Sequence, residues 1–353
     1  MSETTPSLSP RLLLIRIGAI GNALVAVPAI RAIRQARPKA FLALVADPLT
    51  LELLAGCPYL DEFIRYDNRG PEKAGPGYAC FILGLRRRKF THAVHFRRFL
   101  RSELIGLLSG APIRVGFKTG SRLQFLTHYA DYEEGENVIE LNLRLARALG
   151  IEAKDMRLEY WPTRDSARVR EILNSLPGSG PLVAIHPAGA TQRERLWPDF
   201  SELARILRER LQARVVMIGA EAEREIVETT ARALSLPAAT ALGLPLPEVG
   251  ELIRRADLFA GTDSGPAHLA DAAGTPGAII YAPHRGLALQ LKKWKPLGDR
   301  YLAFTPARDC VSCPEDPCPL PRQQQCAAGV PVEEVASGLE KLYAETRGKT
   351  KPE

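Results

Sequence analysis

The sequence predicts an α/β protein in which two doubly wound, mostly parallel sheets form two Rossmann-like domains that face each other across a cleft. Short apolar runs bounded by glycine, proline or other turn residues alternate with segments of helical periodicity. A Gly/Ser/Pro stretch at 177–181 interrupts this alternation, which then starts again. The chain has 353 residues, 46% hydrophobic and 25% charged, as expected for two globular domains of ordinary size.

The first half of the chain contains apolar runs that we expect to be strands, at 11–18, 40–47, 62–66, 91–96 and 113–117. An amphipathic helix ending by Pro38 separates the first two, a helix through Ser109 follows the fourth, and a further helix covers 136–149. Residues 1–10 form a Ser/Thr/Pro-rich tail without an apolar signal region. We therefore assign the N-terminal domain to 11–176.

The second half repeats the pattern. Strands are predicted at 182–190, 213–220 and 277–281, and another apolar run ends at Ala260. Amphipathic segments at 198–212 and 221–234 predict helices between them. We assign the C-terminal domain to 177–330 and a final amphipathic helix to 331–353. Because parallel strands present their carboxyl ends at one edge, ligands are expected at those edges.

The loop Thr262-Asp263-Ser264-Gly265 lies between an apolar strand and an alanine-rich helix. Pro266 suits the first helical turn, and Ser264 or Gly265 is the natural N-cap. The unpaired N–H groups at such a helix start form an anion site, which indicates a phosphate ligand. A purely structural strand-to-helix turn is the alternative.

The net charge of +7 is concentrated in the basic segments 85–90, 96–101 and 291–295. Such segments suit anionic lipid headgroups, phosphorylated substrates or nucleic acid. No aromatic residues alternate with the basic ones in a stacking pattern, so we expect no nucleic-acid partner. No apolar run approaches the length of a membrane helix, and we expect a cytoplasmic protein.

Four segments carry a family resemblance: "LLLIRIGAIGNALVAVPAIRAIRQARP", "VAIHPAGATQRERLWPDFSELARILRE", "VVMIGAEAERE" and "FAGTDSGPAHLADAAGTPGAIIYAP". In order and spacing they resemble glycosyltransferase family 9, the ADP-heptose:lipopolysaccharide heptosyltransferases, from about 11 to about 342. The resemblance implies a GT-B fold, with the nucleotide sugar on the second domain and the acceptor on the first. It also implies an inverting transfer that requires no metal, and a last helix, 331–353, that packs back on the N-terminal domain.

The resemblance implies a set of donor-binding residues in the second domain. The loop motif would hold the sugar and diphosphate, a basic side chain near Trp197 would grip the diphosphate, and an acid after the "VVMIGA" strand would bind ribose. These residues are Thr191, Gln192, Arg195, Glu221, Thr262, Asp263, Ser264 and Gly265. For Glu221 the alternative is a helix-start acid, and for Arg195 a surface arginine.

The first loop departs from the family pattern at the position of the general base. The family has Gly-Asp there, whereas this sequence has Gly21-Asn22. An amide does not take up a proton at neutral pH, so Asn22 is not that base. Three alternatives remain open: another base such as His95 or Asp67, slow transfer with Asn22 orienting the acceptor, or a nucleotide-sugar-binding protein without transfer. A nucleotide-sugar epimerase is a further alternative, since it shares this architecture.

The resemblance also implies the acceptor, an anionic phosphorylated glycolipid of the lipopolysaccharide core at the cytoplasmic face of the inner membrane. Arg16, Gly21, Arg97 and Arg98 are the expected acceptor-binding residues. Electrostatic attachment to the membrane would need no spanning segment. The predicted function is therefore heptosyl transfer from ADP-heptose by a protein peripheral to the inner membrane.

Four cysteines stand close together within 310–326. Cys310, Cys313, Cys318 and Cys326 have the spacing C-x2-C-x4-C-x7-C in a proline-rich loop. Since disulfides are disfavoured in the cytoplasm, this spacing predicts a metal site with four cysteine ligands. A structural zinc, an iron–sulfur cluster and a set of reduced thiols are the alternatives.

Overall fold

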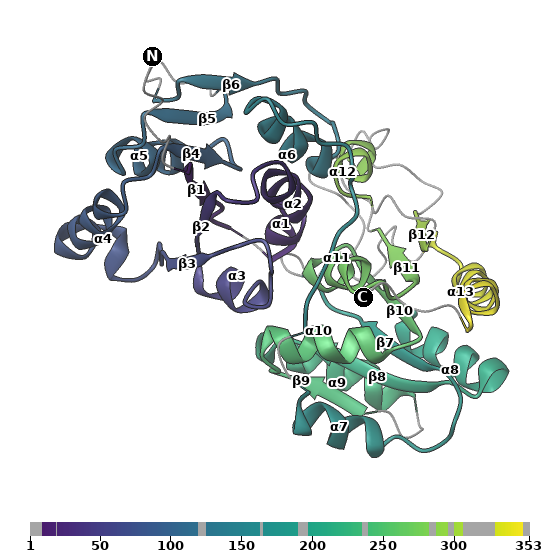
Figure 1. Ribbon diagram of the computed structural model, residues 1–353. Helices are drawn as coiled ribbons and strands as arrows, with labels where there is room; N and C mark the ends of the chain where they lie inside the picture. Colours follow the sequence, from purple (N-terminus) through teal and green to yellow (C-terminus); the bar gives the residue numbers. More distant parts are fainter. Residues whose placement is uncertain are drawn as a thin grey trace, which may run out of the picture. The chain divides into compact units, whose positions relative to one another are not determined.

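The computed structural model describes residues 9–18, 20–118, 125–162, 165–189, 197–234, 239–281, 287–295, 300–305 and 329–348. The chain divides into two compact units, Met1–Arg157 and Leu158–Glu353. Each unit is built on a six-stranded sheet, and every recorded strand pair is parallel (Figure 1). The predicted fold class is therefore confirmed.

The sheet of the first unit has the order β3-β2-β1-β4-β5-β6. Its strands are β1 (Arg11–Ile15), β2 (Phe41–Ala46), β3 (Glu62–Arg65), β4 (His92–His95), β5 (Ile113–Phe117) and β6 (His128–Ala130). The central strands β1 and β2 are buried along almost their whole length, because helices cover both faces of a parallel sheet. β2 and β3 lie on one side of β1, and β4, the next strand in the sequence, pairs with β1 on its other side. A topological switch point therefore lies between β1 and β4.

The helices of the first unit form two groups. On one face, α2 (Val27–Ala36) packs beside α6 (Val138–Arg147). Residues of α4 (Gly75–Arg87) and α5 (Leu100–Leu108) join Leu13, Ile15 and Val45 in one apolar core. Two short helices, α1 (Ile20–Leu24) and α3 (Pro48–Leu53), follow β1 and β2 directly and so lie at the carboxyl edge of the sheet.

The sheet of the second unit has the order β12-β11-β10-β7-β8-β9. Its strands are β7 (Leu182–His186), β8 (Arg214–Gly219), β9 (Ala239–Leu242), β10 (Leu258–Thr262), β11 (Gly277–Ile280) and β12 (Tyr301–Phe304). The topology repeats that of the first unit, and its switch point lies between β7 and β10. The sequence patterns did not predict β6, β9 and β12, each of which has three or four residues and lies at the edge of its sheet.

The helices of the second unit also form two groups. One apolar core contains residues of α8 (Phe200–Leu211), α9 (Arg224–Ala233) and α13 (Val332–Thr346). In the other group, α10 (Leu246–Arg255) contacts α7 (Ala167–Asn174) and α11 (Gly265–Ala272). The remaining helix, α12 (Leu287–Trp294), follows β11.

The boundary between the units and the place of the last helix both differ from the prediction. The second unit begins at Leu158, earlier than the predicted boundary after 176, because the segment before α7 bonds to α10. The Tyr160 hydroxyl donates to the Pro247 carbonyl at 2.9 Å, and the Ser166 N–H donates to a Glu251 carboxylate oxygen at 2.8 Å. These bonds tie residues that the sequence assigned to the N-terminal domain to the second unit.

The last helix packs within the second unit, so the prediction that it returns to the N-terminal domain is wrong. Val335, Ala336 and Leu339 of α13 are fully buried in the same core as α8. Arg210 of α8 pairs with Glu333 at 2.7 Å and with Glu340 at 3.1 Å, both on α13. The apolar face of α13 is thus buried within its own unit.

Candidate functional site

A polar cluster lies at the switch point of the first sheet. It consists of Arg16, Gly18, Asn22, Asp47 and Arg97, which follow the ends of β1, β2 and β4, and we call it the Arg16 cluster. Arg16 is only 4% exposed, and its Nε donates to the Asn22 carbonyl at 2.8 Å. Its Nη1 is buried without a hydrogen-bond partner among the described residues. Burial, followed by the repulsion of Arg97, lowers the pKa of Arg16 to about 9, and Asp47 opposes this shift.

Gly18 allows Arg97 to approach the backbone of the first loop. Its φ is +142°, and a Cβ added there would lie 2.9 Å from Arg97 Nη1, which donates to the Ile17 carbonyl at 3.3 Å. The Gly18 N–H donates to Asp47 at 3.3 Å. Asp47 also accepts from the Thr50 N–H at 3.1 Å and the Thr50 hydroxyl at 2.8 Å, so its carboxylate caps α3.

The structure brings some predicted acceptor residues together and separates one. Arg16, Arg97 and the buried Gly21 share the switch point, where the Gly21 carbonyl accepts from the Val25 N–H at 3.2 Å. Arg98 is engaged elsewhere, because its Nε donates to the Lys118 carbonyl at 3.1 Å and its guanidinium lies 4.2 Å from the centroid of the Tyr132 ring. Arg98 is therefore not part of the Arg16 cluster.

Neither of the two alternative bases has the surroundings that a general base needs. His95 is 1% exposed, its Nδ1 lies 3.1 Å from Ser102 Oγ, and burial lowers its pKa to about 3. Such a ring is a weak proton acceptor and is closed off from substrate. Asp67 accepts from the Arg69 N–H at 2.9 Å and pairs with Arg65 at 3.2 Å, so it stabilises a turn after β3.

The loop at the switch point of the second sheet begins α11. Thr262 ends β10, and its hydroxyl donates to the Ala188 carbonyl at 2.5 Å. Ser264 has the extended backbone of an N-cap, with φ −157° and ψ 173°, yet its side chain caps no N–H of the helix. Its carbonyl accepts from the N–H groups of Ala267 at 3.1 Å and His268 at 3.4 Å. Since Pro266 has no N–H, the Gly265 N–H is the remaining donor of the first turn of α11, and no side chain caps this turn.

Two residues beside this loop were missed in the sequence. His186, at the end of β7, lies with Nδ1 3.1 Å from Ser264 Oγ and Nε2 3.2 Å from a Glu223 carboxylate oxygen. That oxygen also accepts from the Ala220 N–H at 2.8 Å. Burial acts to raise the pKa of Glu223, but the hydrogen bonds from His186 and Ala220 and the charge of His186 outweigh it and lower the pKa. In the sequence, the position of His186 at the end of the strand in "VAIHPAGA" could have indicated that this residue lies beside the loop.

Glu221 differs from Glu223 in its exposure. Its carboxylate is exposed and bonds to Arg224, with both oxygens accepting from that side chain at 2.7 and 2.8 Å. The hydrogen bond and charge of Arg224 lower the pKa of Glu221. Glu221 is thus an accessible carboxylate at the carboxyl end of β8, as a ribose-binding residue requires.

His268, one turn into α11, has the surroundings of a packing residue. It is 7% exposed, and its ring centroid lies 5.6 Å from that of Trp294 on α12. Burial lowers the pKa of His268, while the nearby Asp263 carboxylate acts in the opposite direction. Asp263 therefore lies close to His268 and to the first turn of α11.

Several predicted residues lie outside the described ranges. Thr191, Gln192, Arg195, Cys310, Cys313, Cys318 and Cys326 belong to this group. Among the residues that are described, no group of three or more His, Cys, Asp or Glu side chains is placed to hold a metal ion. The described helices also include none with the length and apolar character needed to cross a membrane.

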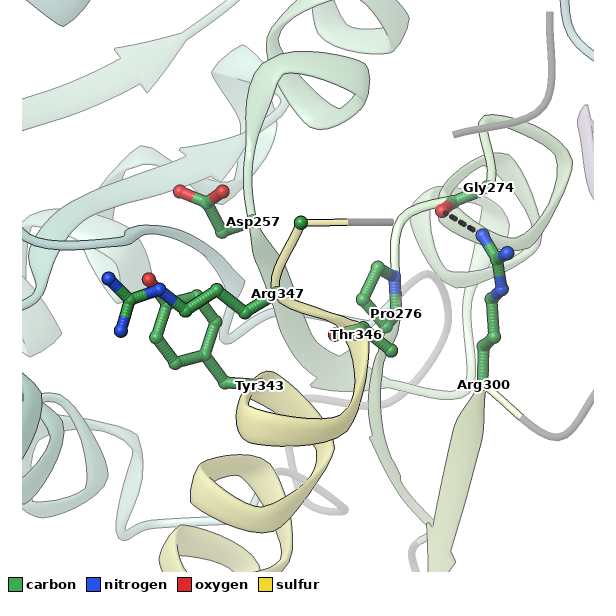
Figure 2. A pocket seen from close by; sticks show the side chains of 8 residues that line it. Asp257, Gly274, Pro276, Arg300, Tyr343, Thr346 and Arg347 are labelled. Atoms are coloured by element: carbon green, nitrogen blue, oxygen red, sulfur yellow. Dashed lines mark hydrogen bonds between the residues drawn. The ribbon is translucent and has the colours of Figure 1, made fainter. Parts of the chain in front are cut away.

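A small hollow of about 100 Å³ lies at the opposite, amino edge of the second sheet (Figure 2). Asp257, Pro276 and Arg300, which directly precede β10, β11 and β12, line it together with the end of α13. Figure 2 shows Arg347 and Tyr343 on one side of the hollow, and Arg300, which donates to the Gly274 carbonyl at 3.4 Å, on the other. This hollow is separate from the switch point.

The two six-stranded parallel sheets, each with polar residues at its switch point, define an α/β protein of the GT-B class. Within that class, residues 80–323 match the model of "Glycosyltransferase family 9 (heptosyltransferase)", and the chain belongs to this family of glycosyltransferases.

Curated relatives and solved structures agree with this assignment. "Lipopolysaccharide heptosyltransferase 3" of Escherichia coli is 26% identical over 299 residues, which cover 80% of this chain and 85% of that protein. The glycosyltransferase family 9 structure from Veillonella parvula superposes with a TM-score of 0.82 at 18% identity, covering 96% of this chain and 98% of that one. The E. coli ADP-heptose lps heptosyltransferase II gives 0.74 at 18% identity, with coverage of 96% and 100%.

Proposed function

We propose that this protein transfers heptose from ADP-heptose to a lipopolysaccharide core acceptor, with inversion at the anomeric carbon. The observation that carries the proposal is the uncapped first turn of α11 at the switch point of a family 9 chain. Its N–H groups and helix dipole suit a diphosphate. The E. coli heptosyltransferase WaaC, which superposes with a TM-score of 0.68 at 17% identity, was solved with ADP-2-deoxy-2-fluoro heptose.

The donor side of this proposal uses residues of the second unit. The diphosphate contacts the amides around Ser264 and Gly265 together with Arg195, and the ribose hydroxyls bond to Glu221. Asp263 accepts hydroxyls of the sugar, since a carboxylate beside a diphosphate would be repelled. Thr191 and Gln192 face the donor. In the reaction the acceptor oxygen forms a bond to the anomeric carbon as the bond to the diphosphate breaks, and the amides stabilise the departing charge.

The acceptor side uses the Arg16 cluster. Arg97 lies close enough to Arg16 for its charge to contribute to the lowered pKa of Arg16, and Arg16 Nη1 lacks a partner among the described residues. A phosphate or carboxylate of the acceptor would supply the missing partner and relieve the repulsion. Gly21 lets the acceptor approach the backbone, and Asn22, half-buried beside Arg16, orients its hydroxyl.

Exposed side chains of α4, of α5 and of the segment 97–99 before α5 support attachment to an anionic membrane surface. The apolar ones are Leu83, Phe99 and Leu100, and the basic ones are Arg86, Arg87, Arg97 and Arg98. Apolar side chains within a basic face favour peripheral binding to anionic lipid at the cytoplasmic leaflet. Flotation with vesicles containing anionic lipid tests this attachment, and an Arg86→Glu/Arg87→Glu variant should stay unbound.

We propose further that the transfer needs no metal and that Cys310, Cys313, Cys318 and Cys326 hold a structural zinc. Their spacing and the number of thiols support this site. Elemental analysis of the purified protein should find about one zinc per chain. Absorbance typical of an iron–sulfur cluster, or no metal, would contradict zinc.

The test of the donor class is a thermal-shift screen with ADP-, GDP-, UDP- and CMP-sugars. ADP-heptose should stabilise the protein, and the shift should disappear in Asp263→Ala and Arg195→Ala. Heptose transfer to a core acceptor is then measured with the same donor. A protein that binds ADP-heptose without transfer would support a non-catalytic function, which the Asn22 substitution and the buried state of His95 favour as the alternative.

A further inference from the structure

A chain of three polar side chains joins neighbouring strands at the carboxyl edge of the second sheet. β7 lies between β8 and β10, so His186 at its end reaches toward both neighbours. On one side its Nε2 lies 3.2 Å from Glu223, which follows β8, and on the other its Nδ1 lies 3.1 Å from Ser264, which follows β10. Both ring nitrogens are therefore used, and the ring orientation is fixed from two sides.

The burial of these three side chains argues against a purely stabilising role. The His186 side chain is 3% exposed and the Glu223 side chain 19%. Burying a charged group in such a place is costly, and well-packed apolar residues usually give equal or greater stability. The arrangement also diverts the Ser264 hydroxyl from capping α11, the usual stabilising role of a serine at a helix start. The fold thus gives up a helix cap to hold this hydroxyl elsewhere.

The direction of the Ser264 hydroxyl indicates how this arrangement affects the first turn of α11. Ser264 Oγ contacts His186 Nδ1 and the Thr262 carbonyl, each at 3.1 Å, and both partners lie on the strand side of the loop. Pro266 has no N–H, so the natural donor to a Ser264 cap is the N–H of Ala267. With Oγ held back, the Ala267 N–H donates only to the Ser264 carbonyl, at 3.1 Å, and no side-chain oxygen lies against the first turn of α11 as a cap.

We propose that His186 and Glu223 are positioning residues for donor binding: Glu223 orients His186, and His186 holds the Ser264 hydroxyl off the first turn of α11. The inference rests on the proposed function, because the anion that takes the vacated place is the diphosphate of the nucleotide sugar. Without the ring, Ser264 would rotate to cap the helix, and its side chain would occupy the space beside the first turn that the diphosphate takes.

The experiment measures the affinity for ADP and the kinetics of transfer in His186→Phe, Ser264→Ala and the double variant. His186→Phe should weaken ADP binding and raise the donor KM about tenfold, or 1.4 kcal/mol, with kcat within about threefold of wild type. Ser264→Ala removes the hydroxyl itself and gives the reference value for the double variant. The double variant should bind ADP as tightly as Ser264→Ala and more tightly than His186→Phe, because the competing oxygen is gone. His186→Asn, whose amide can still bond to Ser264, should also retain affinity.

A matched control comes from the first unit, where His95 also lies 3.1 Å from a serine hydroxyl. His95→Phe should change thermal stability while leaving the donor KM unaltered. A wild-type donor KM in His186→Phe, or a double variant as impaired as His186→Phe alone, would overturn the inference. If His186→Phe does not fold, Glu223→Gln carries the same comparison, because loss of the carboxylate that orients His186 should weaken ADP binding in the same direction, whereas His186→Asn should not. Failure of the unmodified protein to bind ADP or ADP-heptose would instead count against the proposed function itself.

Discussion

The two units each end a strand with a histidine bonded to a serine, and they differ in what lies at the other ring nitrogen. In β4, His95 Nδ1 lies 3.1 Å from Ser102 Oγ, and Nε2 is buried without a partner among the described residues. In β7, His186 makes the same contact with Ser264, and its Nε2 faces Glu223. Because of the Glu223 carboxylate, His186 belongs to a row of hydrogen-bonded side chains, whereas His95 only packs in its core. A histidine bonded to a serine therefore does not have the same role in both units.

The switch points of the two sheets show a second contrast. The first contains two guanidinium groups and a buried nitrogen that finds no partner in the described part of the chain, whereas the second contains bonded side chains and an uncapped helix start. Under the proposed function, the first site binds an anion through side-chain charge and the second through backbone amides. The predictions below test this division, beginning with the largest expected effect.

Asn22→Asp is expected to raise kcat for heptose transfer by about 100-fold, because a carboxylate there can take the acceptor proton. The donor KM should remain unchanged, since Asn22 lies in the first unit. Steady-state kinetics with ADP-heptose and a core acceptor measure the effect, and Asn22→Ala is the control that should bring no gain. An Asn22→Asp variant as slow as wild type would place the missing base elsewhere.

Arg16→Gln is expected to lower kcat/KM for the acceptor by about 30-fold, the loss of a charge-assisted hydrogen bond in a buried site. The donor KM should not change. Arg98→Gln is the matched control, because Arg98 lies outside the Arg16 cluster, and its effect should stay within about threefold. An equal loss in both variants would argue for general surface charge in place of a defined anion site.

Gly18→Ala is expected to raise the acceptor KM about tenfold and to lower the free energy of unfolding by about 2 kcal/mol. The added methyl group would meet Arg97 and force an unfavourable backbone at φ +142°. Gly150→Ala provides the control, because Gly150 also has a positive φ, +75°, with no atom near its Cβ position. Chemical denaturation and kinetics separate backbone strain, common to both variants, from the displacement of Arg97.

The smallest predicted effect is an acid dependence of stability from His95. Burial lowers the pKa of His95 to about 3, far below its ordinary value of 6.5. Protonation therefore favours the unfolded chain, so this stabilisation is complete above pH 6.5 and is lost as the pH falls toward 3. By pH 5.5 the loss should be about 1.4 kcal/mol. Urea denaturation at several pH values should show a smaller slope in His95→Gln; an unchanged slope would contradict the burial argument.

The sequence by itself determined the fold class, the central strands and the loop at 262–265 that begins a helix. Buried parallel strands appear as continuous apolar runs, and a proline after Ser264 marks the start of a helix, so both features are local in the chain. The family pattern also located the substitution at Asn22, which no contact in the structure would have singled out.

Only the tertiary structure decided which distant residues meet. Glu223, His186 and Ser264 come from three neighbouring strands, and Arg16 and Arg97 meet because β4 returns beside β1. Burial likewise depends on the whole fold, and it removed His95 from the candidate bases and placed α13 in the second unit. Strand order and burial depend on many contacts between residues far apart in the sequence, whereas periodicity and helix capping depend on residues that are close in the sequence.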